Sequence, residues 1–256
     1  MRTVAWVLAV AAGAIACDKE PPRPAAKDSG AAPVVSADPP RPKPPEKPMI
    51  VLDDVAVSIN GVRFELAQPD IEGRVTAALA GKPMVENEVV EASVIRAVKT
   101  PRVVSLASAI KAAKAKGMVI KTAGRDNQVG DLPLAWPAAA PDCSAVGFIG
   151  KDRAISAWPA GGGAGAGRFA KGMAGPDMTL GTQGVRKLSL ACESSTWFFS
   201  AEDSVEWGLA FDLAMLVRKG DSSIKGPEGN PGRASTTVLL FDRPVPGRKV
   251  ELGARP

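Results

Sequence analysis

The stretch TWFFSAEDSVEWGLAFDLAMLVRKG, residues 196–220, contains the clearest secondary-structure signals of this chain. Residues 196–201 form a short apolar run, which is typical of a buried strand. Ser204 then offers an N-cap, and apolar residues recur at helical spacing from Trp207 to Val217 until Gly220 ends the pattern. We therefore predict a strand followed by a capped helix.

The residues on either side extend this unit into a sheet. Residues 145–149 and 154–158 are apolar runs that flank a turn, and residues 236–241 form another apolar run after the helix. The order strand, helix, strand implies a right-handed crossover between parallel strands.

The first half of the chain repeats this order. Two alternating runs within residues 55–66 surround Asn60-Gly61, a strong hairpin signal. Asp70 caps the next expected helix, and a strand over residues 88–95 follows.

A second helix in this half is expected to begin at Thr100-Pro101, with Thr100 as its N-cap. Setting Ala97 against Ala201 aligns Thr100 with Ser204, so we predict an internal repeat. The predicted fold class is α+β, with two tandem small domains over residues 49–135 and 138–256. Each domain is expected to be a mixed sheet covered by two helices.

Two segments of this repeat resemble the periplasmic domain of the ExbD/TolR biopolymer-transport family. The segments are SAEDSVEWG (residues 200–208) and, more loosely, AVKTPRVV (residues 97–104). In that family a strand ends in Ala-Asp, and a helix, a glycine and a last strand follow. The resemblance implies a periplasmic fold that dimerises and contacts peptidoglycan or an energy-transducing partner. Family members also carry a transmembrane helix with an embedded aspartate, which has no counterpart here, so the motor role is not carried over.

The N-terminus predicts export and lipidation. Arg2 precedes an apolar run over residues 4–16, which has the length of a signal-peptide core. The run ends in Ala14-Ile15-Ala16-Cys17, which resembles the bacterial lipobox. We predict a signal peptide over residues 1–16 and a lipid anchor on Cys17, in the inner or outer membrane and facing the periplasm. The alternative is an ordinary signal peptide with a chance cysteine.

Residues 17–48 are expected to be a disordered tether after the lipidated cysteine. Residues 18–48 contain ten of the chain's 23 prolines and almost no large apolar residues. A proline-rich chain favours polyproline II, so this tether could reach roughly 90–100 Å.

Composition narrows the function. The chain has no histidine, which removes the commonest general base and zinc ligand. We expect no catalytic residues, no metal site and no cofactor. The net charge is +5, but the lysines and arginines are mixed with acidic residues along the chain. This distribution argues against a nucleic-acid partner.

Cys143 and Cys192 are the two cysteines left after Cys17. Because the periplasm is oxidising, we predict that they form a disulfide; the alternative is two buried free thiols. Each lies just before an expected strand.

The sequence thus predicts a non-enzymatic lipoprotein of the cell envelope with a binding or scaffold role. Its candidate partners are the membrane through lipid at Cys17, peptidoglycan or an envelope transport complex, and further copies of itself. The alternatives are an envelope enzyme that uses Lys, Asp or Ser chemistry, and an accessory subunit of a proton-driven transport motor.

Overall fold

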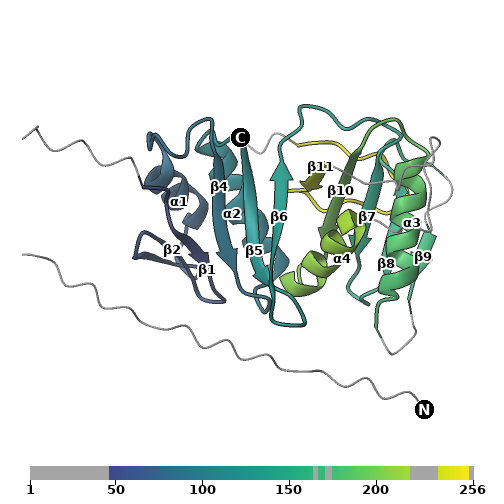
Figure 1. Ribbon diagram of the computed structural model, residues 1–256, viewed down its shortest axis with the longest axis horizontal. Coiled ribbons are helices and arrows are strands. Elements are labelled where there is room, and N and C mark those ends of the chain that lie inside the picture. The colour runs from purple at the N-terminus through teal and green to yellow at the C-terminus, as the bar shows by residue number, and fades with distance from the viewer. Residues whose placement is uncertain (1–45, 164–166, 171–174, 220–235, 254–256) are drawn as a thin grey trace, which may run out of the picture. The chain divides into compact units, whose positions relative to one another are not determined.

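A computed structural model of the chain describes residues 46–163, 167–170, 175–219 and 236–253. It contains two mixed sheets and four helices, which confirms the predicted α+β class (Figure 1). Cys17, the predicted signal peptide and most of the predicted tether lie outside the described residues. No helix in the described part of the chain is long and apolar enough to span a bilayer.

The first sheet has six strands in the order β3-β2-β1-β4-β5-β6, and the second has five in the order β11-β10-β7-β8-β9. The elements of the first half are β1 (Ile50–Leu52), β2 (Ala56–Ile59), β3 (Val62–Glu65), α1 (Ile71–Leu79), β4 (Val89–Val94), α2 (Thr100–Ala112), β5 (Gly117–Ala123) and β6 (Val129–Ala135). Those of the second half are β7 (Ala145–Ile149), β8 (Ile155–Pro159), β9 (Gly167–Phe169), α3 (Met178–Leu190), β10 (Thr196–Ala201), α4 (Trp207–Lys219) and β11 (Thr236–Leu239).

Local signals explain the start of the first half. Asn60 and Gly61 have φ values of 52° and 82°, so both take the left-handed conformation that a tight turn between β2 and β3 requires. Asp70 is the N-cap of α1, and its side chain accepts a hydrogen bond from the backbone N–H of Gly73. Both features are as predicted.

The two sheets share one strand order and one sense of pairing. The order β3-β2-β1-β4-β5 matches β9-β8-β7-β10-β11, and in each series only the last two pairings are parallel. The bounds of β4 and β10 differ by 107 residues at each end, and so do those of α2 and α4. The expected alignment of Ala97 with Ala201, an offset of 104, is therefore wrong by three residues.

The cause of this error is that neither expected cap residue caps its helix. Ser204 lies three residues before the start of α4, and the N-cap of α2 is Lys99, which makes no side-chain capping bond. The expected cap at Ser204 therefore misplaced the start of α4, whereas α2 begins at Thr100 as expected.

One hydrophobic core runs through both halves. Trp197, Phe199, Trp207 and Phe211 form a chain of ring contacts with centroids 5.3–6.2 Å apart, and all four side chains are buried. This aromatic chain is continuous with the aliphatic core of the first half. A second, smaller cluster occupies the other face of the second sheet, where Val250 from the C-terminal segment packs.

Each sheet lies within one of the predicted domain ranges, but contacts cross between them. β6 and β11 lie close together without forming a ladder, and α4 contacts β6 as well as β10. A Cβ atom on Gly130 of β6 would lie 3.1 Å from the ring of Phe211, so α4 packs tightly on that strand. The described residues of both halves belong to one compact unit.

Candidate functional site

The two halves are joined by loops that run side by side like short strands. The β4–α2 loop and the β10–α4 loop form an antiparallel bridge at Lys99 and Glu206. The backbone N–H of Trp207 donates to Val98 O at 2.7 Å, and the N–H of Thr100 donates to Val205 O at 3.0 Å. Lys99 and Glu206 are equivalent under the 107-residue offset, so the bridge lies at the centre of the repeat.

Two buried side chains reinforce this join. The Thr100 hydroxyl, expected to cap its own helix, donates instead to Val205 O at 3.0 Å. Trp207 Nε1 donates to Thr122 Oγ1 at 2.9 Å, and Thr122 donates in turn to Val94 O. Since each bond satisfies a polar atom inside the core, these residues hold the halves in one arrangement.

An ion-pair cluster forms at the edge of the join. Arg96 binds Asp212 through two parallel hydrogen bonds of 2.9 and 2.8 Å, and Arg125 Nε donates to the same carboxylate at 2.7 Å. Arg96 also donates to Ala123 O and Gly208 O. The hydrogen bond that Arg96 donates to Asp212 raises the pKa of Arg96 above its already high ordinary value.

A cleft of about 450 Å³ opens beside this cluster, and we call it the junction cleft. It is lined by four cations and two acids: Arg96, Arg125, Lys151, Arg153, Glu206 and Asp212. The lining has a net positive charge because the cations outnumber the acids. Its volume is in the range of small-molecule binding sites.

The position of the junction cleft follows from the topology. Arg96 follows the end of β4 and Arg125 follows the end of β5, whereas Lys151 and Arg153 follow the end of β7. These are the carboxyl ends of parallel strands, which is where open α/β sheets bind their ligands. Loops of both halves therefore contribute charge to one site.

The cations contributed by the second half lie on a tight turn. Arg153 N donates to Gly150 O at 2.8 Å, and Gly150 N donates to Ala154 O at 2.9 Å. Arg153 has a φ of 61°, a conformation that few residues other than glycine adopt. Asp152, between the two cations, pairs with Arg168 instead. Lys151 and Arg153 make no ion pair within the described ranges, and both side chains are exposed.

The chemistry that this arrangement supports is anion binding. Guanidinium groups bind carboxylates and phosphates through paired N–H donors. The acid of the cluster, Asp212, is a poor candidate for a general base because its carboxylate already accepts three hydrogen bonds from arginine. The part of the chain that the structure describes brings together no group of three acids or cysteines that could hold a metal.

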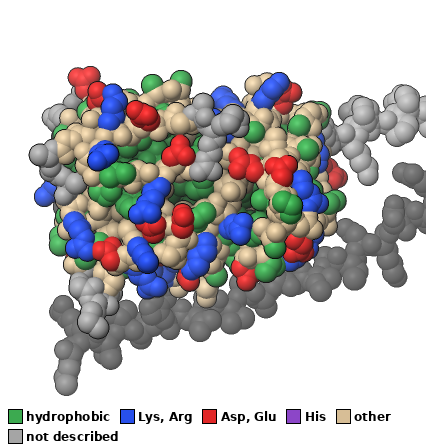
Figure 2. All heavy atoms as spheres, turned by 180° about the vertical axis from the view of Figure 1, so that it is seen from behind, with side chains coloured by type: hydrophobic (Ala, Val, Ile, Leu, Met, Phe, Trp, Pro, Cys, Tyr) green, Lys and Arg blue, Asp and Glu red, His purple; other side chains and the backbone are tan. Residues whose placement is uncertain are grey.

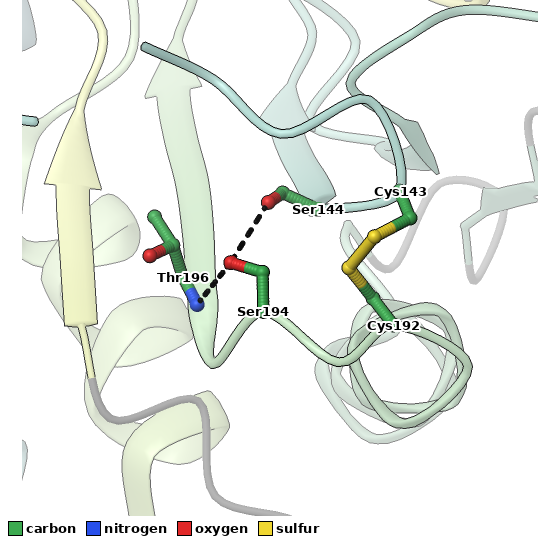
Figure 3. The surroundings of a disulfide bond; sticks show 5 residues. All are labelled: Cys143, Ser144, Cys192, Ser194 and Thr196. Atoms are coloured by element: carbon green, nitrogen blue, oxygen red, sulfur yellow. Dashed lines mark hydrogen bonds between the residues drawn. A yellow bond between two sulfur atoms is a disulfide. The ribbon is translucent and has the colours of Figure 1, made fainter. Parts of the chain in front are cut away.

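The predicted cysteine pair lies away from the junction cleft, at the start of the second sheet. Cys143 and Cys192 lie at disulfide distance, with Cα atoms 5.2 Å apart (Figure 3). Cys143 precedes β7 and Cys192 follows α3, just before β10, as the sequence predicted. Beside them, Ser194 Oγ accepts a hydrogen bond from Thr196 N at 3.2 Å.

Sequence reasoning did not find the cleft residues. Arg96 and Asp212 are 116 positions apart, and each by itself is an ordinary charged residue. The available signal was positional, because Arg96 follows the strand expected over residues 88–95, and Lys151 and Arg153 follow the apolar run over residues 145–149. Charge is otherwise mixed over the surface, and Figure 2 shows Lys and Arg interspersed with Asp and Glu on the face that it presents.

Comparison with known protein families, with curated proteins and with solved structures finds no match for this chain. The resemblance to the ExbD/TolR family therefore stays a prediction, and the junction cleft is the feature from which a function can be argued.

Proposed function

We propose that this chain is a non-enzymatic lipoprotein of the cell envelope that binds an anionic envelope component in the junction cleft. The observation that carries the proposal is the cleft itself, in which loops of both halves place four cations at the carboxyl ends of parallel strands. Peptidoglycan is the component that we propose, because its peptides carry carboxylates that guanidinium groups recognise.

The anchor and the tether fit this role. Lipid on Cys17 would hold the chain at a membrane, since each buried methylene contributes about 0.8 kcal/mol. The proline-rich segment would let the folded body reach roughly 90–100 Å from the membrane surface. A binding domain on such a tether could contact a polymer layer that lies apart from the bilayer.

A sedimentation assay tests the binding role. The whole chain, solubilised in detergent, is mixed with purified peptidoglycan sacculi at physiological salt, and the bound fraction is measured. We expect retention well above that of an unrelated protein of equal net charge. Retention no better than that control would reject peptidoglycan as the ligand.

Metabolic labelling tests the anchor. Labelled palmitate should enter the wild-type chain, and Cys17→Ser should abolish the labelling because it removes the acceptor thiol. A Cys143→Ser chain is the matched control and should label like wild type. Equal labelling of all three chains would remove the lipoprotein assignment.

A further inference from the structure

We propose that the ligand group taken by the junction cleft is a diacid with two separate carboxylates, one bound by Arg125 and the other by Lys151 and Arg153. This inference rests on the assignment of the cleft as the binding site in the proposed function. The inference specifies how many charges the ligand carries and that these charges are separate.

The first step is to separate the cations that are already used from those that are free to bind. The Arg96 side chain is 29% exposed, and its two terminal nitrogens already make four contacts, with Asp212, Ala123 O and Gly208 O. Arg96 therefore positions Asp212. A Cβ atom at Gly208 would lie 2.9 Å from the Arg96 Cβ, so the close approach of α4 depends on this glycine.

Arg125 is available to a ligand. Its side chain is 68% exposed, and its contact with Asp212 uses Nε. Its two terminal nitrogens make no hydrogen bond within the described ranges. Because the Nε bond fixes the plane of the guanidinium, Asp212 orients Arg125 for a planar carboxylate.

Lys151 and Arg153 supply the second position. They come from the β7–β8 turn of the second half, whereas Arg125 comes from the β5–β6 turn of the first half. The left-handed conformation of Arg153 and the hydrogen bonds of its turn fix the backbone that carries this pair. Cations from separate loops match charges that are also separate along a ligand.

The separation of the cations favours two carboxylates over a phosphate. A compact dianion bound at one position would leave the cations of the other position without a partner charge, whereas a diacid places one carboxylate at each. The volume of about 450 Å³ also exceeds what an inorganic anion fills and suits a short acidic peptide.

Calorimetric titration of the whole chain in detergent at low salt tests this proposal. The probes are three blocked dipeptides, Glu-Glu, Glu-Gln and Gln-Gln, together with inorganic phosphate. We expect the affinity for Glu-Glu to exceed that for Glu-Gln by a factor of about ten or more, and Gln-Gln to bind most weakly. Equal binding of Glu-Glu and Glu-Gln, or tighter binding of phosphate, would overturn the diacid assignment.

The variants are Lys151→Gln and Arg153→Asn, chosen because asparagine tolerates the left-handed backbone. Each should weaken Glu-Glu binding about tenfold while thermal unfolding stays unchanged. Lys116→Gln is the matched control. Lys116 is an exposed cation that directly precedes the start of β5, whereas the cleft residue Arg125 follows the end of that strand. If the control weakens binding as much as the cleft variants do, binding is nonspecific and the proposal fails.

The outcomes separate this inference from the proposed function. If the wild type and Arg153→Asn bind sacculi equally well, the proposed envelope role stands and the diacid site is rejected. A chain that binds Glu-Glu in the cleft but not sacculi would keep the site and lose peptidoglycan as its source.

Discussion

Asp212 is a single residue through which the second half binds the first. Its side chain is 12% exposed and comes from α4 of the second half, and both of its arginine partners come from the first half. Removing one partner of a partly buried ion pair leaves the other charge uncompensated, which costs more than an exposed pair would. The carboxylate therefore contributes to stability as well as orienting Arg125.

Replacing Asp212 tests that role. Asp212→Asn keeps the shape but removes the charge, so we expect the free energy of unfolding to fall by about 1–3 kcal/mol. Urea titration followed by tryptophan fluorescence measures the change. Asp203→Asn is the control, because Asp203 is exposed, and it should leave the midpoint unchanged. A midpoint for Asp212→Asn that equals the wild-type value would show that the cluster is not stabilising.

The acidic residues set the pH range over which the fold is stable. The hydrogen bond from Lys121 lowers the pKa of Glu91, and the hydrogen bond from Arg168 lowers the pKa of Asp152. A carboxylate whose pKa is lower in the folded state than in the unfolded state contributes stability above its unfolded pKa of about 4. That contribution is lost as the pH falls through the folded-state pKa.

Because the chain has no histidine, we expect the urea midpoint to be flat between pH 7 and about pH 5.5 and to fall below about pH 4. Urea titrations at several pH values measure the profile. Glu91→Gln should reduce the fall of the urea midpoint below about pH 4, because it removes one of the titrating carboxylates. A midpoint that already changes between pH 7 and pH 5.5 would mean that another group titrates in that range.

At the scale of the element, α3 depends on glycine to approach the second sheet. Gly181 lies against Ile155 of β8, and a Cβ atom there would lie 2.9 Å from the Ile155 Cβ. Gly184 faces the ring of Phe169 on the edge strand β9 instead. The first contact involves a fixed atom next to the backbone, and the second involves the far end of a side chain that can turn.

The two glycines should therefore respond differently to alanine. Alanine gains about 1 kcal/mol of helix propensity at either position, but overpacking against Ile155 costs about 1–3 kcal/mol. We expect Gly181→Ala to destabilise the fold and Gly184→Ala to be neutral or stabilising, as thermal unfolding would measure. Equal effects of the two substitutions would mean that α3 can shift on the sheet.

At the scale of the whole molecule, the cysteine pair closes a long loop. Cys143 and Cys192 are 49 residues apart, and the loop between them includes β7, β8, β9 and α3. A crosslink over that length stabilises the fold by about 4 kcal/mol, mainly by restricting the unfolded chain. This is a large share of a typical stability of about 5–15 kcal/mol.

Alkylation followed by mass spectrometry shows the redox state of the chain as it is isolated from cells. We expect Cys143 and Cys192 to be protected until a reductant is added. The double variant Cys143→Ser with Cys192→Ser should unfold at a lower temperature, by an amount similar to that caused by reducing the wild type. Two thiols that are alkylated without reductant would show that the bond does not form in cells.

Local signals in the sequence determined several elements correctly. The turn at Asn60-Gly61, the cap at Asp70 and the apolar run of β10 each depend on neighbours within a few residues. The proximity of Cys143 and Cys192 followed from placing each of them at the entrance to a strand. Such features are predictable because the interactions that favour them lie within the segment itself.

Other elements were decided by packing. A second helix was expected in this half, but the position of α3 was not predicted, because α3 contains two glycines and its stability comes from contacts with β7, β8, β9 and α4. β6 was missed because Pro133 and Asp131 interrupt its apolar pattern, and its place at the edge of the first sheet tolerates both.

Sequence patterns alone were enough to predict the two hairpins, the strand–helix order around α2 and α4 and the chemistry expected of the cysteines. Only the tertiary structure decided the offset of 107 residues, the join between the halves and the junction cleft. The expected caps misled the alignment, because Ser204 lies three residues before α4 and the Thr100 hydroxyl donates to Val205 O, 105 residues away, and not to its own helix. The cleft is likewise built from cations on loops that meet only after both sheets have folded. Long-range contacts of this kind leave no periodic pattern in the chain, and for that reason no reading of local spacing could reveal them.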